Sequence, residues 1–244
     1  MISRDYLCNN KHSLRLFPRC MKELSELEYQ DLIKNARILE RDRAGGKVFL
    51  TKDDFILKCF RSKKLFSSSV IWPYAERFKK NSEQLKQMGF CSVNVTETYF
   101  IPQQARYAVS YPRLPGKTIR QALSDNPTDL KPIESMAAFI ASLHNQGIYF
   151  RSLHFGNILY LDDGQYALID VVDTHFQKSS LNLAKRVRNF KHLARYQTDI
   201  DNICHYGNEV FLSSYLQSSE LCNVSKFLFR KIYAKLIRPS AHLS

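Results

Sequence analysis

The sequence lacks long runs of apolar residues, although 44% of its 244 residues are hydrophobic. Apolar stretches such as Phe55-Ile56-Leu57 are soon interrupted by charge, and none approaches the ~20 apolar residues that a transmembrane helix needs. The first residues also lack the apolar segment followed by small residues that marks a secretory signal. We therefore expect a cytoplasmic protein that does not cross a membrane.

Paired cysteines are missing as well. The six cysteines, at positions 8, 20, 59, 91, 204 and 222, contain no C-x-x-C pair, and no two histidines have the spacing of zinc ligands. This pattern argues against a disulfide framework and against a zinc site. We expect six free thiols that serve mainly in packing.

Acidic residues are fewer than basic ones, since 23 Asp and Glu oppose 36 Lys and Arg and leave a net charge of +13. Such an excess favours an anionic partner: a nucleotide, a phosphorylated glycan or glycolipid, or an anionic lipid surface. Nucleic acid is not favoured, because no known reading motif accompanies the charge. Residues 226–237 mix Lys and Arg with aromatic residues as an interfacial helix does, so peripheral contact with an anionic lipid surface is a hypothesis.

The periodicity predicts an α+β fold in three segments. Residues 1–35 form an extension with one short helix, which a capping box at Ser25 begins. Residues 36–111 form a small antiparallel sheet with one helix. A three-stranded meander occupies residues 37–60, and the helix occupies residues 73–88. Two further strands are expected at 93–101 and 107–111. Residues 112–244 are mainly helical and begin at a Pro-Gly pair that marks the boundary.

Within the helical segment we expect helices at 118–123, 132–145, 181–196, 199–215 and 224–237. One hairpin interrupts them, formed by strands at 157–161 and 166–171 around the turn Asp162-Asp163-Gly164.

The chemistry concentrates in the loop and hairpin that follow the second of these helices. The loop from Arg151 ends in Asn157 at the entrance of a strand, and the returning strand ends in Asp170, thirteen residues later. This arrangement brings an amide oxygen and a carboxylate to one end of the hairpin. Proteins usually hold Mg²⁺ with a small number of oxygen ligands, and substrate phosphates complete its coordination. If Lys58 on the third strand of the meander supplies a cation, a nucleotide site follows.

These residues resemble the protein-kinase-like fold, and within it the bacterial lipopolysaccharide core kinases and the related toluene tolerance proteins, over about residues 36–215. The resemblance implies a two-lobed fold and the cofactors ATP and Mg²⁺. It implies that Lys58 contacts the α and β phosphates and that Asn157 and Asp170 hold the metal. Gly45 and Gly46 stand in the place of the glycine-rich loop, although the full G-x-G-x-x-G is missing.

The catalytic loop departs from the kinase pattern. Ser152 stands where the catalytic Asp is expected, and a hydroxyl does not accept a proton as a carboxylate does at pH 7. Phe150 replaces the usual His, and the wording Phe-Arg-Ser-Leu-His is similar to that of the toluene tolerance branch. His154 is a candidate for the role of the missing Asp.

Two functions stay open. The first, which the resemblance implies, is an ATP-dependent phosphotransferase at the inner face of the inner membrane. It acts on a sugar of lipopolysaccharide core or a related envelope glycan, with Arg151 and Ser152 facing the acceptor. The second is a pseudokinase that binds nucleotide or a protein partner without transfer.

Two side-chain roles in this site have alternatives. The helix partner of Lys58 is expected to be Glu76, with Glu83 and Asn81 as alternatives. Asp173 is either a second metal ligand or a cap of the next segment.

Overall fold

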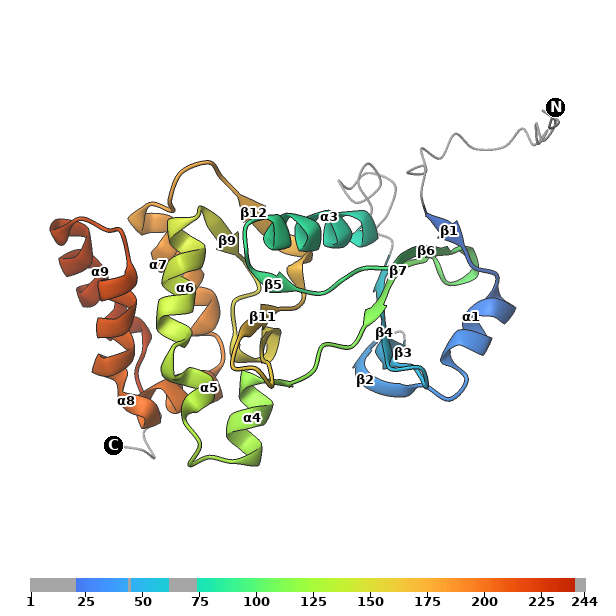
Figure 1. Ribbon diagram of the computed structural model, residues 1–244, viewed down its shortest axis with the longest axis horizontal. Coiled ribbons are helices and arrows are strands. Elements are labelled where there is room, and N and C mark those ends of the chain that lie inside the picture. The colour runs from blue at the N-terminus through green and yellow to red at the C-terminus, as the bar shows by residue number, and fades with distance from the viewer. Residues whose placement is uncertain (1–20, 44, 62–73, 240–244) are drawn as a thin grey trace.

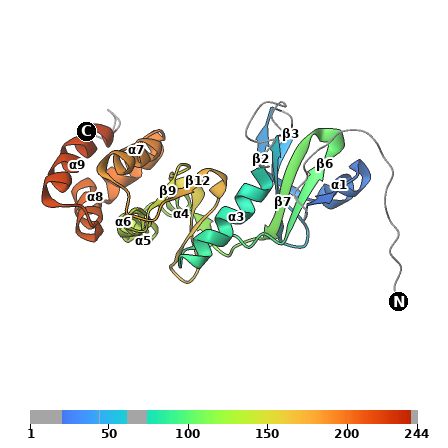
Figure 2. The same ribbon diagram turned by 90° about the horizontal axis from the view of Figure 1, so that it is seen from above.

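The computed structural model describes residues 21–43, 45–61 and 74–239 (Figure 1). Over these residues the chain is a mixed α+β protein with an antiparallel-rich sheet and several helices. The predicted α+β class is therefore confirmed at this level. The largest sheet lies at one end of the molecule and the last three helices lie at the other, as two perpendicular views agree (Figure 2).

The largest sheet contains the predicted meander. Its strands, in spatial order, are β1 (Lys22–Glu23), β6 (Glu97–Ile101), β7 (Arg106–Pro112), β4 (Phe55–Arg61), β3 (Gly45–Leu50) and β2 (Arg37–Asp42). Only the pairing of β1 with β6 is parallel. A 3₁₀ turn, η1 (Pro102–Gln104), joins β6 to β7. The register sets Lys58 on β4 opposite Val48 on β3 and Val109 on β7.

Helix α1 (Glu26–Ile33) covers one face of this sheet. Ser25 begins it with the predicted capping box, because its hydroxyl accepts from the amide of Glu28 while the Glu28 carboxylate accepts from the amide of Ser25. Tyr29 then packs on Phe49 and Leu57 in a small core of its own. The predicted extension thus contributes a strand and a helix to the sheet, and its residues 1–20 lie outside the described chain.

The other face of β4 meets helix α3 (Tyr74–Gln87). Successive side chains of a strand point to opposite faces, so Leu57 and Cys59 join the small core while Ile56 and Phe60 join the main one. Lys58 lies between Ile56 and Phe60 and shares their face.

Two smaller sheets follow. One has the order β5 (Cys91–Ser92), β11 (Tyr166–Leu168), β10 (Ile158–Tyr160) and β8 (Lys117–Thr118). It includes the predicted hairpin, whose turn ends at Gly164 with a positive φ of 82°. The other pairs β9 (Ile148–Phe150) with β12 (Thr174–Phe176) in antiparallel register. Because β5 pairs with β11, a segment that precedes residue 112 completes a sheet of the C-terminal part.

Helices make up most of the remaining chain. They are α4 (Ile119–Asp125), α5 (Lys131–Glu134), α6 (Met136–Asn145), α7 (Leu183–Leu193), α8 (Gln197–Ser218) and α9 (Asn223–Leu236). Two 3₁₀ turns, η2 (Phe155–Asn157) and η3 (Val171–Asp173), lie on either side of the hairpin. The main core extends from Ile56 and Phe78 to Phe229 and Tyr233, so it connects the face of the large sheet with the last helix.

Several element predictions need correction. The helix predicted at 132–145 is two helices, because Ser135 leaves helical geometry between α5 and α6. The helix predicted at 199–215 is bent, because Gly207 adopts a φ of 123° within α8. The strand predicted from residue 93 begins only at Glu97. Gly45 and Gly46 begin strand β3 instead of forming the turn before it.

Two predicted absences can be compared with the structure. Within the described ranges, no helix has the length and apolarity needed to cross a bilayer. The four cysteines that the structure describes, Cys59, Cys91, Cys204 and Cys222, are free thiols as predicted, and Cys8 and Cys20 lie outside these ranges.

Candidate functional site

Lys58 is a buried cation on the central strand β4. Its residue is 6% exposed, and its ammonium lies 5.6 Å from the ring centre of Phe78 on α3 and 6.0 Å from that of Phe60. Contact with aromatic faces stabilises a cation only in part. A lysine this deeply buried therefore needs a negatively charged group close to its Nζ.

Asp170 provides that group. Its Oδ1 accepts from Lys58 Nζ at 2.6 Å, an ion pair between residues 112 apart in the sequence. Asp170 follows β11 and adopts left-handed backbone geometry, with φ 58° and ψ 45°, which is uncommon outside glycine. Strained geometry of this kind clusters at functional sites. The side chain of Asp170 keeps 27% of its exposure against 8% for Lys58, so solvent reaches the carboxylate more readily than the ammonium.

Helix α3 holds the segment that follows Asp170. The amide of Asn81 donates to the carbonyl oxygens of Val171, Val172 and Thr174, at 2.8, 3.1 and 3.3 Å. Arg77 donates to the Asp173 carboxylate at 2.7 Å. Asn81 and Arg77 are four residues apart and therefore share a face of the helix. This face fixes the turn η3, and with it the position of Asp170.

Asn157 is paired with Ile169, the residue before Asp170. The amide of Ile169 donates to the backbone oxygen of Asn157 at 3.0 Å, so the hairpin closes immediately before Asp170. The side-chain amide of Asn157 donates to the backbone oxygen of Ser152 at 3.0 Å. This bond uses the NH₂ group and leaves the amide oxygen as an acceptor. The predicted amide oxygen and carboxylate are thus brought to one end of the hairpin.

Asp199 holds the loop of residues 151–157 in place, and the sequence analysis did not identify it. Its carboxylate is fully buried and accepts from the Arg120 guanidinium through both oxygens, at 2.9 Å each, and from the Phe155 amide at 2.9 Å. Burial raises the pKa of Asp199, while the Phe155 amide and Arg120 act against this rise. In the sequence, Asp199 reads only as an acidic residue at a helix start, so no local signal distinguishes it.

His154 lies in the same loop. Its Nδ1 accepts from the amide of Gly156 at 3.1 Å, and its ring lies 4.5 Å from that of Tyr196. Burial, followed by the Arg120 guanidinium, lowers the pKa of His154 to about 4, and Asp170 and Lys58 also act on it electrostatically. His154 is therefore close to the ion pair, and its imidazole is neutral and weakly basic at pH 7.

Glu76 does not lie against Lys58, so the predicted pairing is wrong. Its carboxylate accepts from the hydroxyl of Thr98 on β6 at 3.1 Å. Of the two alternatives, Glu83 is exposed, and Asn81 holds the turn η3 instead. The ion pair with Asp170 takes the place of a helix carboxylate.

Two other predicted site residues have partners that the sequence did not indicate. Arg77 pairs with one carboxylate oxygen of Asp173, and the role of Asp173 as a metal ligand or as a cap stays a prediction. Gly46 lies two residues before Val48, the cross-strand neighbour of Lys58, and its carbonyl accepts from Arg106 at 2.6 Å. The two glycines therefore lie on β3, three and two residues before the cross-strand neighbour of Lys58.

Arg151 is exposed. Its electrostatic neighbours include Tyr149 and His192, which belong to β9 and α7. The structure thus brings Lys58, Asp170 and Asn157 together at one end of the hairpin, with Ser152 attached through its backbone oxygen. His154 interacts electrostatically with the ion pair, and Arg151 interacts with Tyr149 and His192.

The donor set fits a hard cation. Asn157 and Asp170 offer oxygen atoms, which Mg²⁺ prefers, and Mg²⁺ usually has few protein ligands beside substrate phosphates. In the part of the chain that the structure describes, no cluster of three or more His, Cys, Asp or Glu residues suits a metal ion. The residues present therefore offer two protein ligands for a metal.

Comparison of the chain with models of known protein families and with curated proteins found no match. The geometry of the site therefore carries the functional argument. It consists of a buried lysine paired with an aspartate in left-handed geometry, an asparagine beside that aspartate, and a loop fixed by a buried carboxylate.

Proposed function

We propose that the chain binds ATP at Lys58 and Asp170 and transfers its terminal phosphoryl group. The ion pair of these two residues carries the proposal, because it sets a phosphate-binding cation beside a metal-binding carboxylate on two elements far apart in the sequence. Lys58 would contact the nucleotide phosphates, and Asn157 and Asp170 would hold Mg²⁺, which supplies charge neutralisation. This arrangement agrees with the two-lobed, protein-kinase-like organisation that the sequence resembles.

The acceptor that we propose is a sugar of lipopolysaccharide core or a related envelope glycan. This proposal rests on the resemblance of the loop from Arg151 to Asn157 to that of envelope glycan kinases. The basic excess of the chain supports an anionic acceptor.

We also propose peripheral contact between α9 and an anionic membrane. Val224, Phe227 and Leu228 are the exposed apolar residues of this helix, at 70%, 58% and 43% exposure. The ammonium of Lys231 lies 4.4 Å from the ring centre of Phe227. Apolar side chains surrounded by lysines are the pattern of helices that lie in an anionic lipid interface.

A second function, nucleotide binding without transfer, is favoured by Ser152. The loop has no carboxylate in the catalytic position, and Asp199 cannot serve instead because its oxygens already bind Arg120 and Phe155. His154 is a weak base. General-base help of the missing kind is worth about 10²–10⁴-fold, and positioning with charge neutralisation supplies much of the remaining acceleration.

Thermal unfolding with and without ATP and Mg²⁺ tests the nucleotide site. Ligand at 100 times its dissociation constant stabilises the native state by about 2.7 kcal/mol, which raises Tm by about 5 °C or more in a chain of this size. We expect a Mg²⁺-dependent shift that Lys58→Ala abolishes. Lys47→Ala on the neighbouring strand, where the lysine forms only a surface pair with Glu40, is the matched control. The absence of a shift in the native protein at millimolar Mg·ATP would refute the site.

Phosphate release from ATP, with water as acceptor, separates the two functions. Native turnover that disappears in Asp170→Ala supports phosphoryl transfer. No native turnover, together with turnover in Ser152→Asp, supports nucleotide binding without transfer. Labelled phosphate from ATP on an envelope glycan extract then tests the acceptor class.

A further inference from the structure

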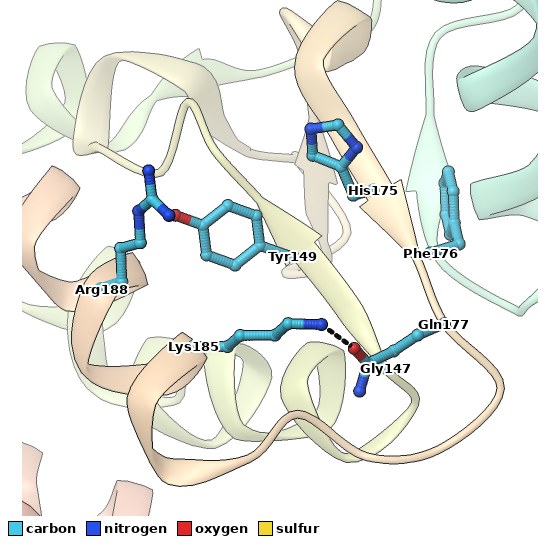
Figure 3. A pocket seen from close by; sticks show the side chains of 7 residues that line it. All are labelled: Gly147, Tyr149, His175, Phe176, Gln177, Lys185 and Arg188. Carbon is cyan, nitrogen blue, oxygen red and sulfur yellow. Dashed lines mark hydrogen bonds between the residues drawn. The ribbon is translucent and has the colours of Figure 1, made fainter.

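A hollow of about 290 Å³ lies between β9, β12 and α7, apart from the ion pair of Lys58 and Asp170. Its lining includes Tyr149 on β9, His175 and Phe176 on β12, and Lys185 and Arg188 on α7 (Figure 3). We call this place the basic hollow. Gly147 and Gln177 close one end, where the Lys185 ammonium donates to the side-chain oxygen of Gln177.

The charged residues that line the basic hollow, Lys185 and Arg188, are both cations. Tyr149 has Arg188, Arg151 and Arg195 as electrostatic neighbours, and His192 has the same three arginines. None of the residues that line the hollow is acidic. For Arg151, Arg188 and Arg195 the structure records no ion pair within its described ranges, whereas Arg77 and Arg120 each have one. One guanidinium, that of Arg188, lines the hollow, and those of Arg151 and Arg195 act electrostatically on Tyr149 and on His192 beside it, which favours an anion at this place.

His192 contacts the lining residue Tyr149 and supplies a second observation. It is 93% buried, its Nε2 lies 2.9 Å from the Tyr149 hydroxyl, and its Nδ1 has no hydrogen-bond partner in the described chain. Burial and the three arginines lower the pKa of His192. An anion at the Tyr149 hydroxyl would reverse this electrostatic balance and favour a protonated imidazole.

We propose that the basic hollow, with the neighbouring Arg151 and Arg195, binds a phosphate monoester carried by a small molecule such as a sugar phosphate. Arginine side chains recognise phosphate oxygens through paired, charge-assisted hydrogen bonds. The rings of Tyr149 and Phe176 offer apolar surface to the carbon skeleton of the ligand.

The size of the hollow favours a small ligand over a polymer. A volume of about 290 Å³ is at the lower end of the range for small-molecule sites. A nucleic acid would need a basic track along its backbone, with aromatic rings spaced for successive bases. The inference stands on the hollow itself, and it holds whether or not Lys58 binds ATP.

Calorimetric titration with glucose 6-phosphate tests the proposal, with glucose as the neutral comparison and inorganic phosphate as the bare anion. We expect the native protein to bind glucose 6-phosphate and not glucose. The double variant Arg188→Ala, Arg195→Ala should weaken binding at least tenfold. The double variant Arg37→Ala, Lys235→Ala removes the same net charge from exposed positions elsewhere and should change the dissociation constant less than twofold.

A second readout locates the ligand. In proton-detected NMR, the ring signals of His192 should titrate at higher pH when glucose 6-phosphate is bound. Lys58→Ala should leave the dissociation constant of glucose 6-phosphate unchanged; a loss of binding in this variant would move the phosphate to the ATP site and overturn the proposal. Equal weakening of binding by both double variants would also overturn the proposal. So would the absence of binding to the native protein at about 10 mM ligand.

Discussion

Asp199 and Arg120 form an ion pair whose two members differ in environment. The side chain of Asp199 has no exposure, whereas that of Arg120 keeps 33%. Removing one partner of a buried pair is costly mainly when the other charge stays buried and unpaired. Arg120 can turn toward water, so the loss should be smaller than for a fully buried pair. Its importance is local, because the same carboxylate holds the Phe155 amide in the loop of Asn157.

We predict that Asp199→Asn lowers the free energy of unfolding by about 2 kcal/mol, since the charge is lost while an acceptor for Phe155 remains. Glu209→Gln is the control, because its pair with Arg230 is exposed and worth less than about 1 kcal/mol. Urea unfolding measures both. Equal effects of the two substitutions would contradict the special role of Asp199.

His144 belongs to a buried polar network beneath β9. Its Nδ1 lies 2.8 Å from the Tyr215 hydroxyl, and its Nε2 lies 2.9 Å from the amide oxygen of Asn189. Because Asn189 donates its NH₂ to the Phe150 carbonyl, its oxygen must accept, so Nε2 carries the proton and Nδ1 accepts from Tyr215. Arg186 also donates to the Tyr215 oxygen, and its positive charge opposes a second proton on the imidazole.

This network predicts a fall in stability with acid. Burial lowers the pKa of His144 to about 3 from 6.5. In that window the unfolded chain binds a proton that the folded chain does not, so stability is full above pH 6.5 and falls as the pH drops toward 3. The contribution is at most about 1.4 kcal/mol per pH unit. Urea unfolding between pH 7 and pH 4.5 should show a shallower dependence in His144→Gln; identical slopes would show that His144 titrates normally.

At the scale of elements, α3 holds the turn that directly follows Asp170. Asn81 holds three carbonyl oxygens around η3, and the turn has no regular strand pairing until Thr174. A buried carbonyl that loses its donor costs about 1–3 kcal/mol. The site therefore depends on a helix that supplies no ligand of its own.

We predict that Asn81→Ala lowers the free energy of unfolding by about 2 kcal/mol and reduces the Mg·ATP-dependent rise in Tm by more than half, because the backbone of Asp170 is no longer fixed. The matched control on the same helix is Glu83→Ala, an exposed residue, which should leave both quantities nearly unchanged. A full ATP-dependent rise in Asn81→Ala would show that η3 is held by other contacts.

Local signals predicted the elements that local chemistry determines. The capping box at Ser25, the meander and the turn at Gly164 follow from neighbouring residues, and the structure confirms them. The break at Ser135 and the bend at Gly207 depend on how helices pack, which periodicity does not encode. The pairing of β5 with β11 joins residues that are 76 apart in the sequence, and no pattern in either strand predicts it.

The candidate site was predictable in part for the same reason. The hairpin placed Asn157 next to Asp170, because both residues flank one turn-linked pair of strands. The partner of Lys58 was not predictable, because whether α3 or η3 supplies the anion depends on distances between separate elements. The role of Asp199 could not be predicted, since its burial results from the contact of α8 with the loop that contains Phe155.

At the scale of the whole molecule, α9 lies at the end opposite the large sheet (Figure 1). Phe229 and Tyr233 attach it to the core at 1% exposure each, so the opposite face of the helix is directed outward. We predict salt-sensitive binding to vesicles with anionic lipid. Phe227→Ser with Leu228→Ser should weaken vesicle binding tenfold or more, since each large apolar side chain contributes about 1.5–3 kcal/mol when fully buried and these two are about half exposed before binding.

Vesicle sedimentation measures this binding. Leu27→Ser is the control, because Leu27 is exposed on α1 at the other end of the molecule. Binding that persists in the α9 variant, or that ignores salt, would contradict a role of this helix at the membrane.

The strand β5 has a consequence for how such a chain can be rearranged in evolution. A recombination between residues 112 and 117 would separate β11 from the neighbour that completes its sheet and Asp170 from Lys58. The transplanted C-terminal part would carry an open sheet edge, which invites aggregation, and an aspartate without its counterion. The two parts of the molecule should therefore be inherited together and not shuffled as independent modules.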